Sequence, residues 1–133
     1  MSASVSELVE RLVERFEREG LRVVRRGFLE GFSGLSHFFD LIVEDPQSGK
    51  KIAISLIDKL GFEHVISILG TRLDTRTPHV VFASTIEPGV ERILRGSNVM
   101  VISLGGVAIA GSVPEGLEEK VLGDVLKILG GIG

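Results

Sequence analysis

Two apolar runs separated by a short turn constrain the fold of this chain most. The first run extends from about His37 to Glu44, and the second from Ile52 to Ile57. Between them lies Asp45-Pro-Gln-Ser-Gly49, in which the proline presets φ and the glycine accepts a positive φ. We therefore expect a β-hairpin with Asp40 embedded in an apolar strand. A carboxylate in that place needs a metal ion or hydrogen-bond partners, because an unpaired buried charge costs several kcal/mol.

Periodic patterns on both sides of this hairpin predict an α/β domain. Apolar residues recur at three- and four-residue spacing over residues 5–16, 62–69, 90–94 and 117–129, which predicts helices. Short apolar or β-branched runs over residues 21–28, 37–44, 52–57, 79–83 and 98–104 predict strands, and residues 105–116 predict turns. The order α-β-β-β-α-β-α-β-α predicts a five-stranded mixed sheet flanked by helices. Its first three strands form an antiparallel meander, and its later strands are parallel through right-handed crossovers.

The composition predicts a single domain over residues 1–133, since domains of this size bury roughly two-thirds of their unfolded surface. No cysteine is present, which excludes disulfides, zinc-thiolate sites and cysteine nucleophiles. No apolar segment approaches the roughly 20 residues of a membrane span. We therefore expect a cytoplasmic protein without a membrane partner. The absence of Cys and Trp, with many Glu and Arg, also fits a thermophile.

The charge balance limits how the chain could contact nucleic acid. The formal net charge is -3 and the pI is about 5.6, which argues against binding by bulk positive charge. Any contact with DNA would need a local basic patch. Arg22, Arg25 and Arg26 form one candidate, which Arg15 and Arg18 of the first helix could extend. The alternative is that these arginines form exposed ion pairs with nearby glutamates.

Several short motifs precede or lie within the hairpin. Glu19-Gly-Leu-Arg-Val-Val24 follows the first helix, Ser33-Gly34 precedes the first apolar run, and Asp40 lies inside that run. These motifs and the element order resemble the PD-(D/E)XK or restriction-endonuclease-like superfamily, and within it Mrr-like domains and archaeal Holliday-junction resolvases. The resemblance covers about residues 4–104. The segment from Ser33 to Ile42 is also similar to uncharacterised archaeal domains of this superfamily.

The resemblance implies nuclease chemistry that depends on a divalent metal ion, Mg²⁺ or Mn²⁺. Two carboxylates hold the metal, which lowers the pKa of a bound water, and a lysine two residues after the second acid helps to orient that water. Asp40 matches the first acid, which by this resemblance would be a metal ligand. Ser55 and Ile57 stand where the second acid and the lysine are expected. The motif is therefore degenerate in this chain.

Asp58 and Lys59 could replace the missing groups only if a β-bulge re-aims them, because Asp58 alternates onto the face opposite Ser55. For Asp40 itself, two roles stay open. It could bind a metal ion, or it could accept hydrogen bonds from the Ser33 or Ser36 hydroxyl or from backbone N–H groups.

Other titratable residues have simpler interpretations. Strand alternation places His37 opposite Asp40, which favours a hydrogen-bonded loop histidine over shared metal ligation. We expect His64 and His79 to be surface or boundary residues. Glu10, which could supply a further acid, lies at the edge of the first helix, where a solvated position is favoured.

These observations lead to three hypotheses of function. The preferred one is a catalytically incomplete domain that serves as a nucleic-acid-associated or protein-interaction module, with Arg22, Arg25, Arg26, Ser33 and Gly34 as the nucleic-acid-binding residues. The second is an active metal-dependent nuclease that uses Asp40, Asp58 and Lys59. The third is a structural subunit partnered with a catalytic paralogue. For the preferred hypothesis we expect a homodimer, for which Phe38, Phe39 and the last helix with its Gly-rich tail could supply the interface. The alternative is that these apolar residues fill the core.

Overall fold

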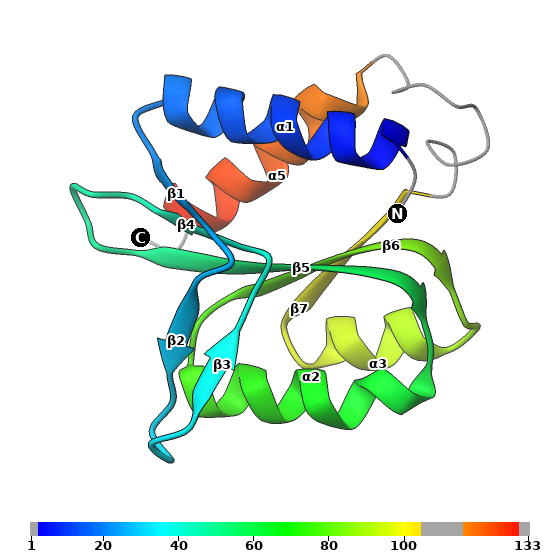
Figure 1. Ribbon diagram of the computed structural model, residues 1–133. Helices are drawn as coiled ribbons and strands as arrows, with labels where there is room; N and C mark the ends of the chain where they lie inside the picture. The colour runs from blue at the N-terminus through cyan, green and yellow to red at the C-terminus, as the bar shows by residue number, and fades with distance from the viewer. Residues whose placement is uncertain (1–2, 105–115, 131–133) are drawn as a thin grey trace.

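The computed structural model describes residues 3–104 and 116–130, and Figure 1 shows the arrangement of their helices and strands. Apart from Gly116, the predicted turn region 105–116 lies outside the described residues. The elements in chain order are α1 (Ala3–Arg18), β1 (Arg22–Arg25), β2 (Phe28–Glu30), β3 (Ser36–Phe38), β4 (Leu41–Glu44), β5 (Lys51–Leu60), α2 (Phe62–Thr75), β6 (His79–Ile86), α3 (Val90–Gly96), β7 (Val99–Ser103) and α5 (Leu117–Gly130).

Five of the strands form one mixed sheet in the order β1-β4-β5-β6-β7. The β1·β4 and β4·β5 pairs are antiparallel, whereas β5·β6 and β6·β7 are parallel. The sequence prediction of a five-stranded mixed sheet flanked by helices is therefore confirmed, including the antiparallel meander at its start. None of the helices among the described residues is both long and apolar enough to cross a membrane.

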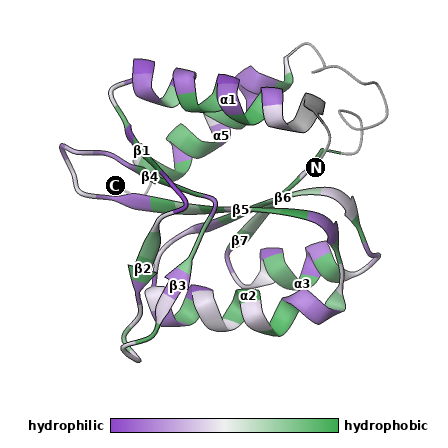
Figure 2. Ribbon diagram, in the orientation of Figure 1, coloured by the Kyte–Doolittle hydropathy of each residue, from purple (hydrophilic) through white to green (hydrophobic). Residues whose placement is uncertain are grey.

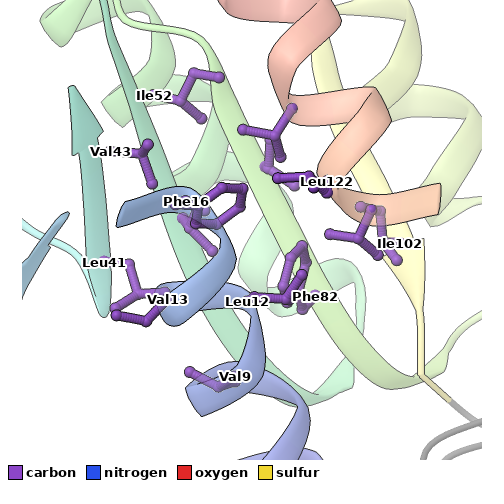
Figure 3. Packing of buried hydrophobic residues seen from close by; sticks show 14 of the residues in the cluster. Val9, Leu12, Val13, Phe16, Leu41, Val43, Ile52, Phe82, Ile102 and Leu122 are labelled. Carbon is purple, nitrogen blue, oxygen red and sulfur yellow. The ribbon is translucent and has the colours of Figure 1, made fainter. Parts of the chain in front are cut away.

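The helices form two layers, with α1 and α5 over one face of the sheet and α2 and α3 over the other (Figure 1). In the first layer, Leu12 and Phe16 of α1 pack toward Phe82 of β6 and Leu122 of α5 (Figure 3). Figure 2 shows the corresponding alternation of hydrophobic and hydrophilic residues along α1. Arg15 of α1 also forms an ion pair with Glu119 of α5, and this contact links the two helices.

The apolar run from His37 to Glu44 does not form one strand. It divides into β3 and β4, and β3 pairs with β2 in a separate two-stranded sheet that lies beside α2 (Figure 1). Phe39 and Asp40 connect the two strands at a bend. The prediction that Asp40 is embedded in a strand is therefore wrong, and its side chain is exposed.

Hydrogen bonds at the bend explain why the chain leaves the main sheet there. The Arg26 N–H donates to the Asp40 carbonyl at 2.8 Å, and the Phe39 N–H donates to the Gly27 carbonyl at 2.9 Å. Arg26 adopts a φ of 51°, in the left-handed region that only a few non-glycine residues occupy. This turn of the backbone redirects β1 into β2, and β3 back into β4.

Candidate functional site

The Asp40 carboxylate binds the backbone of the neighbouring strand. Its Oδ2 accepts a hydrogen bond from the Leu56 N–H at 2.7 Å. The ladder between β4 and β5 ends at the pair Leu41↔Ile54, so the Leu56 N–H has no acceptor on β4. Asp40 supplies that acceptor where the two strands separate. Of the roles that the sequence left open for Asp40, the structure shows a hydrogen bond from a backbone N–H group.

Asp40 faces the same cavity as the two degenerate motif positions. Asp40, Ser55 and Ile57 all line a cavity of about 310 Å³ between the sheet and α2. The Ser55 Oγ lies 2.9 Å from Nε2 of His79. Ile57 packs against the hydrophobic cluster under α2 and α3. The fold thus brings the three positions together, but Ser55 is engaged with a histidine and Ile57 with apolar neighbours.

Asp58 and Lys59 are not part of this cavity. The pairing of β5 with β6 keeps one constant offset from Ala53↔His79 to Leu60↔Ile86, so β5 contains no inserted residue in this region, all of which the structure describes. Asp58 and Lys59 are both exposed, and neither lines the cavity that contains Asp40. The structure therefore does not bring the three residues of the migrated site together.

The motif positions at this cavity do not offer the ligands of a divalent metal centre, although Glu63 and His64 also line the cavity. Among residues 3–104 and 116–130, no group of three or more His, Cys, Asp or Glu side chains is placed to hold a metal ion. Mg²⁺ and Mn²⁺ prefer several oxygen ligands, commonly carboxylates. Here one oxygen of Asp40 already accepts from Leu56, and the Ser55 hydroxyl lies against His79. The residues at this site do not fit the metal ion that the superfamily resemblance implies.

His79 occupies a different environment from the one expected. It is 4% exposed, so the prediction of a surface or boundary position is wrong. Its ring makes an edge-on contact with Phe39, with the centroids 5.3 Å apart. Burial, followed by the nearby Arg72 guanidinium, lowers the pKa of His79 to about 4, so the ring is neutral at pH 7. Its strand lies between two others, which a pattern of local residues does not reveal.

A second polar network joins the β2–β3 hairpin to α2. Asp74 accepts hydrogen bonds from the Ser33 N–H at 2.8 Å and the Ser33 hydroxyl at 2.6 Å, and its Oδ2 lies 2.6 Å from His37 Nε2. His37 Nδ1 lies 3.3 Å from the Thr71 hydroxyl. The Ser33 hydroxyl, then His37, lowers the pKa of Asp74 to about 2. His37 is hydrogen-bonded as expected, although it lies on a strand and not in a loop.

The arginines proposed for nucleic acid divide between two surfaces. Arg22 and Arg26 line a groove of about 330 Å³ together with Lys51. Arg25 lies on the other side of β1, where it forms an ion pair with Glu10 of α1 at 2.7 Å. No sequence pattern indicates Lys51, which joins this surface only because β5 and β1 both pair with β4.

The other proposed binding residues lie near the tip of the hairpin. Gly34 adopts a φ of 89° in the turn between β2 and β3, and Ser33 contacts Asp74 through both its N–H and its hydroxyl. In this structure, Gly34 therefore shapes the turn of the hairpin, and Ser33 anchors the hairpin to α2.

The residues proposed for a homodimer interface differ in their exposure. Phe38 is 74% exposed, whereas Phe39 is 5% exposed and packs in the interior. In α5, Val121, Leu122, Val125 and Leu129 are buried against the core, whereas Leu117, Leu126 and Ile128 are partly buried. Residues 131–133 of the Gly-rich tail lie outside the described residues. Among the large apolar residues described in the proposed interface, Phe38 has the largest exposed fraction.

Comparisons with known proteins place the chain beside an archaeal relative. No protein-family model matches the sequence. Two solved structures overlap with 78% of the chain at 16% identity, namely an EndoMS–dsDNA complex with a TM-score of 0.46 and a repair endonuclease from Pyrococcus abyssi with a TM-score of 0.44. The chain spans 45% and 48% of the lengths of those two proteins.

The sequence relative is much more similar. An uncharacterised protein of Archaeoglobus fulgidus is 47% identical over 119 residues, and the alignment covers 90% of this chain and 92% of that protein. Identity at this level over nearly the whole of both proteins shows common descent. The chain therefore belongs to the same protein family as the uncharacterised protein of Archaeoglobus fulgidus.

Proposed function

We propose that this protein is a restriction-endonuclease-like domain that does not cleave DNA and acts as a nucleic-acid-associated module. The observation that carries the proposal is the environment of the degenerate motif. Ser55 stands at the position of the second acid, and its hydroxyl lies against the buried His79. Ile57 stands at the position of the lysine and packs against apolar residues. Ser55 and Ile57 therefore supply neither the second metal-binding carboxylate nor the cation that would orient the attacking water.

The groove lined by Arg22, Arg26 and Lys51 supports the nucleic-acid role. Its cations come from β1, from Arg26 directly after β1, and from β5, which β4 separates from β1, so the fold gathers charges that are scattered in the sequence. Glu44 lies within 4.0 Å of both Arg22 and Lys51. Because this one carboxylate faces three cations, the groove keeps a net positive charge. Phosphate contacts of this kind fix a protein on nucleic acid without reading its sequence. The groove is therefore the proposed contact for the phosphate backbone.

A cleavage assay tests the first half of the proposal. Purified protein should leave double-stranded, single-stranded and four-way-junction DNA intact in the presence of Mg²⁺ or Mn²⁺. Cleavage by the wild-type protein that Asp40→Asn abolishes would overturn the proposal. If Asp58→Asn and Lys59→Met also abolished that cleavage, the nuclease with a migrated site would be correct.

A binding assay tests the second half. Fluorescence anisotropy with a labelled duplex should show binding that weakens steeply between about 50 mM and 200 mM salt, because phosphate contacts release counterions. The double variant Arg22→Gln/Arg26→Gln should reduce the slope of log K against log salt by about 2, as expected for two lost contacts. Arg92→Gln, on the exposed side of α3, is the matched control. No binding by the wild type at low salt would favour the structural-subunit hypothesis instead.

A further inference from the structure

A basic cavity lies at the end of the sheet where β6 and β7 begin. Its volume is about 500 Å³, which is within the range of small-molecule sites. Arg72 from α2 and Arg95 from α3 line it, and His79 and Val99, the first residues of β6 and β7, form part of its wall. Neither arginine belongs to the groove proposed for nucleic acid. His79 also lines the cavity that contains Asp40, so its ring stands between the two cavities.

Two buried polar atoms at this cavity have no partner. The Arg72 Nε and the His79 Nδ1 make no hydrogen bond with any residue in the described ranges 3–104 and 116–130. Buried polar groups in folded proteins are nearly always hydrogen-bonded, because an unsatisfied one carries the full cost of losing its water. His79 is 4% exposed, so the surrounding solvent does not readily supply that partner. An unpartnered polar atom beside a cavity offers a hydrogen-bonding position to a ligand.

The charges at this cavity favour an anion. Arg95 lies 3.4 Å from Glu91 and donates to the Val101 carbonyl at 3.2 Å, so its guanidinium is held at the cavity wall. Within the described part of the chain, Arg72 forms no ion pair. Guanidinium groups present several N–H donors in a planar fork that matches the oxygen atoms of phosphate. Two such groups beside one cavity give it an excess of donors and of positive charge.

The hydrogen-bond state of His79 is compatible with an anionic ligand. Its Nε2 lies 2.9 Å from the Ser55 Oγ. When the Ser55 hydroxyl donates to Nε2, the neutral ring carries its proton on Nδ1 and becomes a donor there. Arg72 Nε–H, the Arg95 guanidinium and His79 Nδ1–H then supply donors from α2, α3 and β6. The rest of the cavity wall includes apolar residues, namely Pro78, Val99, Met100 and Ile128.

We propose that this cavity binds the phosphate group of a small organic phosphate. The phosphate oxygens accept hydrogen bonds from Arg72, Arg95 and His79, and the organic part of the ligand packs against the apolar wall. The proposal does not rest on the proposed function, because the groove lined by Arg22, Arg26 and Lys51 lies elsewhere on the fold.

Nuclear magnetic resonance of the ¹⁵N-labelled protein tests the proposal at Arg72 Nε and at the His79 ring. Inorganic phosphate is titrated at constant ionic strength, with sodium chloride as the balancing salt, while the Arg72 Nε–H and His79 ring resonances are followed. We expect a saturable shift with a Kd on the order of 1 mM or tighter. Adenosine 5′-monophosphate should bind more tightly than inorganic phosphate, because its nucleoside part adds apolar contact. Adenosine alone should not shift the Arg72 resonance.

Matched variants separate this site from bulk charge and from the nucleic-acid groove. Arg95→Gln should weaken binding at least tenfold as read from His79, and Arg72→Gln should do the same. Arg92→Gln, on the same helix as Arg95 but outside the cavity lining, should bind like the wild type. Arg22→Gln/Arg26→Gln should also leave the Arg72 shift unchanged. Circular dichroism spectra identify any variant that does not fold, and the conclusion then rests on the other arginine.

Several outcomes would overturn the proposal. A shift that rises linearly with phosphate and matches that of chloride would show screening alone. Equal loss of binding in Arg95→Gln and Arg92→Gln would show a nonspecific effect of net charge. Saturable binding of acetate without binding of phosphate would assign the cavity to a carboxylate. Loss of the Arg72 shift in Arg22→Gln/Arg26→Gln would place the phosphate in the groove.

Discussion

His37 Nε2 lies 2.6 Å from Oδ2 of Asp74, and this contact ties the β2–β3 hairpin to α2. The hairpin is not part of the main sheet, so its position depends on such contacts with α2. The Phe32 N–H also donates to the Asp74 carbonyl at 3.0 Å. Asp74 thus holds the hairpin through both its side chain and its backbone.

Removing the charge of Asp74 should destabilise the protein in a pH-dependent way. Its pKa is lowered from 3.8 to about 2, first by the Ser33 hydroxyl and then by His37. A carboxylate with a depressed pKa stabilises the folded state fully above its unfolded pKa, and this stabilisation is lost as the pH falls through the folded pKa. Asp74→Asn should therefore lower the urea midpoint at neutral pH, and its difference from wild type should shrink between about pH 4 and pH 2.

Urea denaturation followed by far-UV circular dichroism measures this difference at each pH. Asp58→Asn is the control, since Asp58 is exposed and lies outside the network. If the two variants followed the same pH dependence, the network around Asp74 would not be the source of the effect.

A side chain at Gly31 should disturb the same network. A Cβ atom at this position would overlap the Asp74 carboxylate, which must then move away from Ser33 and His37. Gly31→Ala should lower stability in the wild-type background and have a much smaller effect in Asp74→Ala. A double-mutant cycle by urea denaturation measures this coupling.

Gly70→Ala is the matched control for the glycine change. Gly70 is exposed in α2, and a Cβ there would meet no atom within 4 Å. This substitution should stabilise the protein by about 0.5–1 kcal/mol, because alanine is the better helix former. An equal loss of stability from Gly31→Ala with and without Asp74 would contradict the assigned overlap.

The sequence predicted the main sheet well because its signals are local. The proline- and glycine-containing turn at residues 45–49 and the apolar runs on both sides of it are read within a few residues. The sequence does not predict the division of the run at Phe39 and Asp40, since apolar residues continue on both sides of the bend. Two backbone hydrogen bonds, one with Arg26 and one with Gly27, separate β3 from β4. The pattern of apolar residues gives no sign of backbone hydrogen bonds.

The polar contacts of the candidate site were less predictable because they join distant parts of the chain. Ser33 and Asp74 are 41 residues apart, and Ser55 and His79 are 24 residues apart. His79 follows Pro78 and begins a strand, a place where a boundary residue is common. It is buried because β6 lies between β5 and β7 and because Phe39 packs on its ring. Neither cause is visible before the strand order is known.

The buried His79 should make the protein less stable as the pH falls through the mildly acidic range. Its pKa is lowered from 6.5 to about 4 by burial, so the unfolded chain binds a proton that the folded chain excludes. Stability should therefore fall between pH 6.5 and about pH 4, by an amount on the order of 3 kcal/mol. His79→Gln keeps a polar partner for Ser55 but does not titrate, so the slope of stability against pH should be smaller.

The same urea experiment at several pH values measures the His79 effect, and its window lies above that of Asp74. His64→Gln is the control, since His64 lies at the start of α2 and is not buried. An unchanged slope in His79→Gln would mean that other groups cause the loss of stability in acid.

The exposed aromatic face of the β2–β3 hairpin should mediate self-association. Phe28 and Phe38 pair across the two strands with ring centroids 5.9 Å apart, and they are 58% and 74% exposed. Phe32 and Leu35 of the same hairpin are also more than half exposed. The paired Phe28 and Phe38 rings form an exposed apolar surface, and a twofold dimer is the simplest way to cover it. Phe38→Ser with Phe28→Ser should therefore convert a dimer into a monomer.

Size-exclusion chromatography with light scattering measures this change. The wild type should have twice the chain mass of 14.3 kDa, and the double variant should have the mass of one chain. Ile93→Ser is the control, because Ile93 is 40% exposed but lies on α3, away from the hairpin. A wild-type protein that stays monomeric at high concentration would contradict the dimer. Loss of association in Ile93→Ser alone would move the interface to α3, because removing one exposed apolar side chain weakens only the contact in which it is buried.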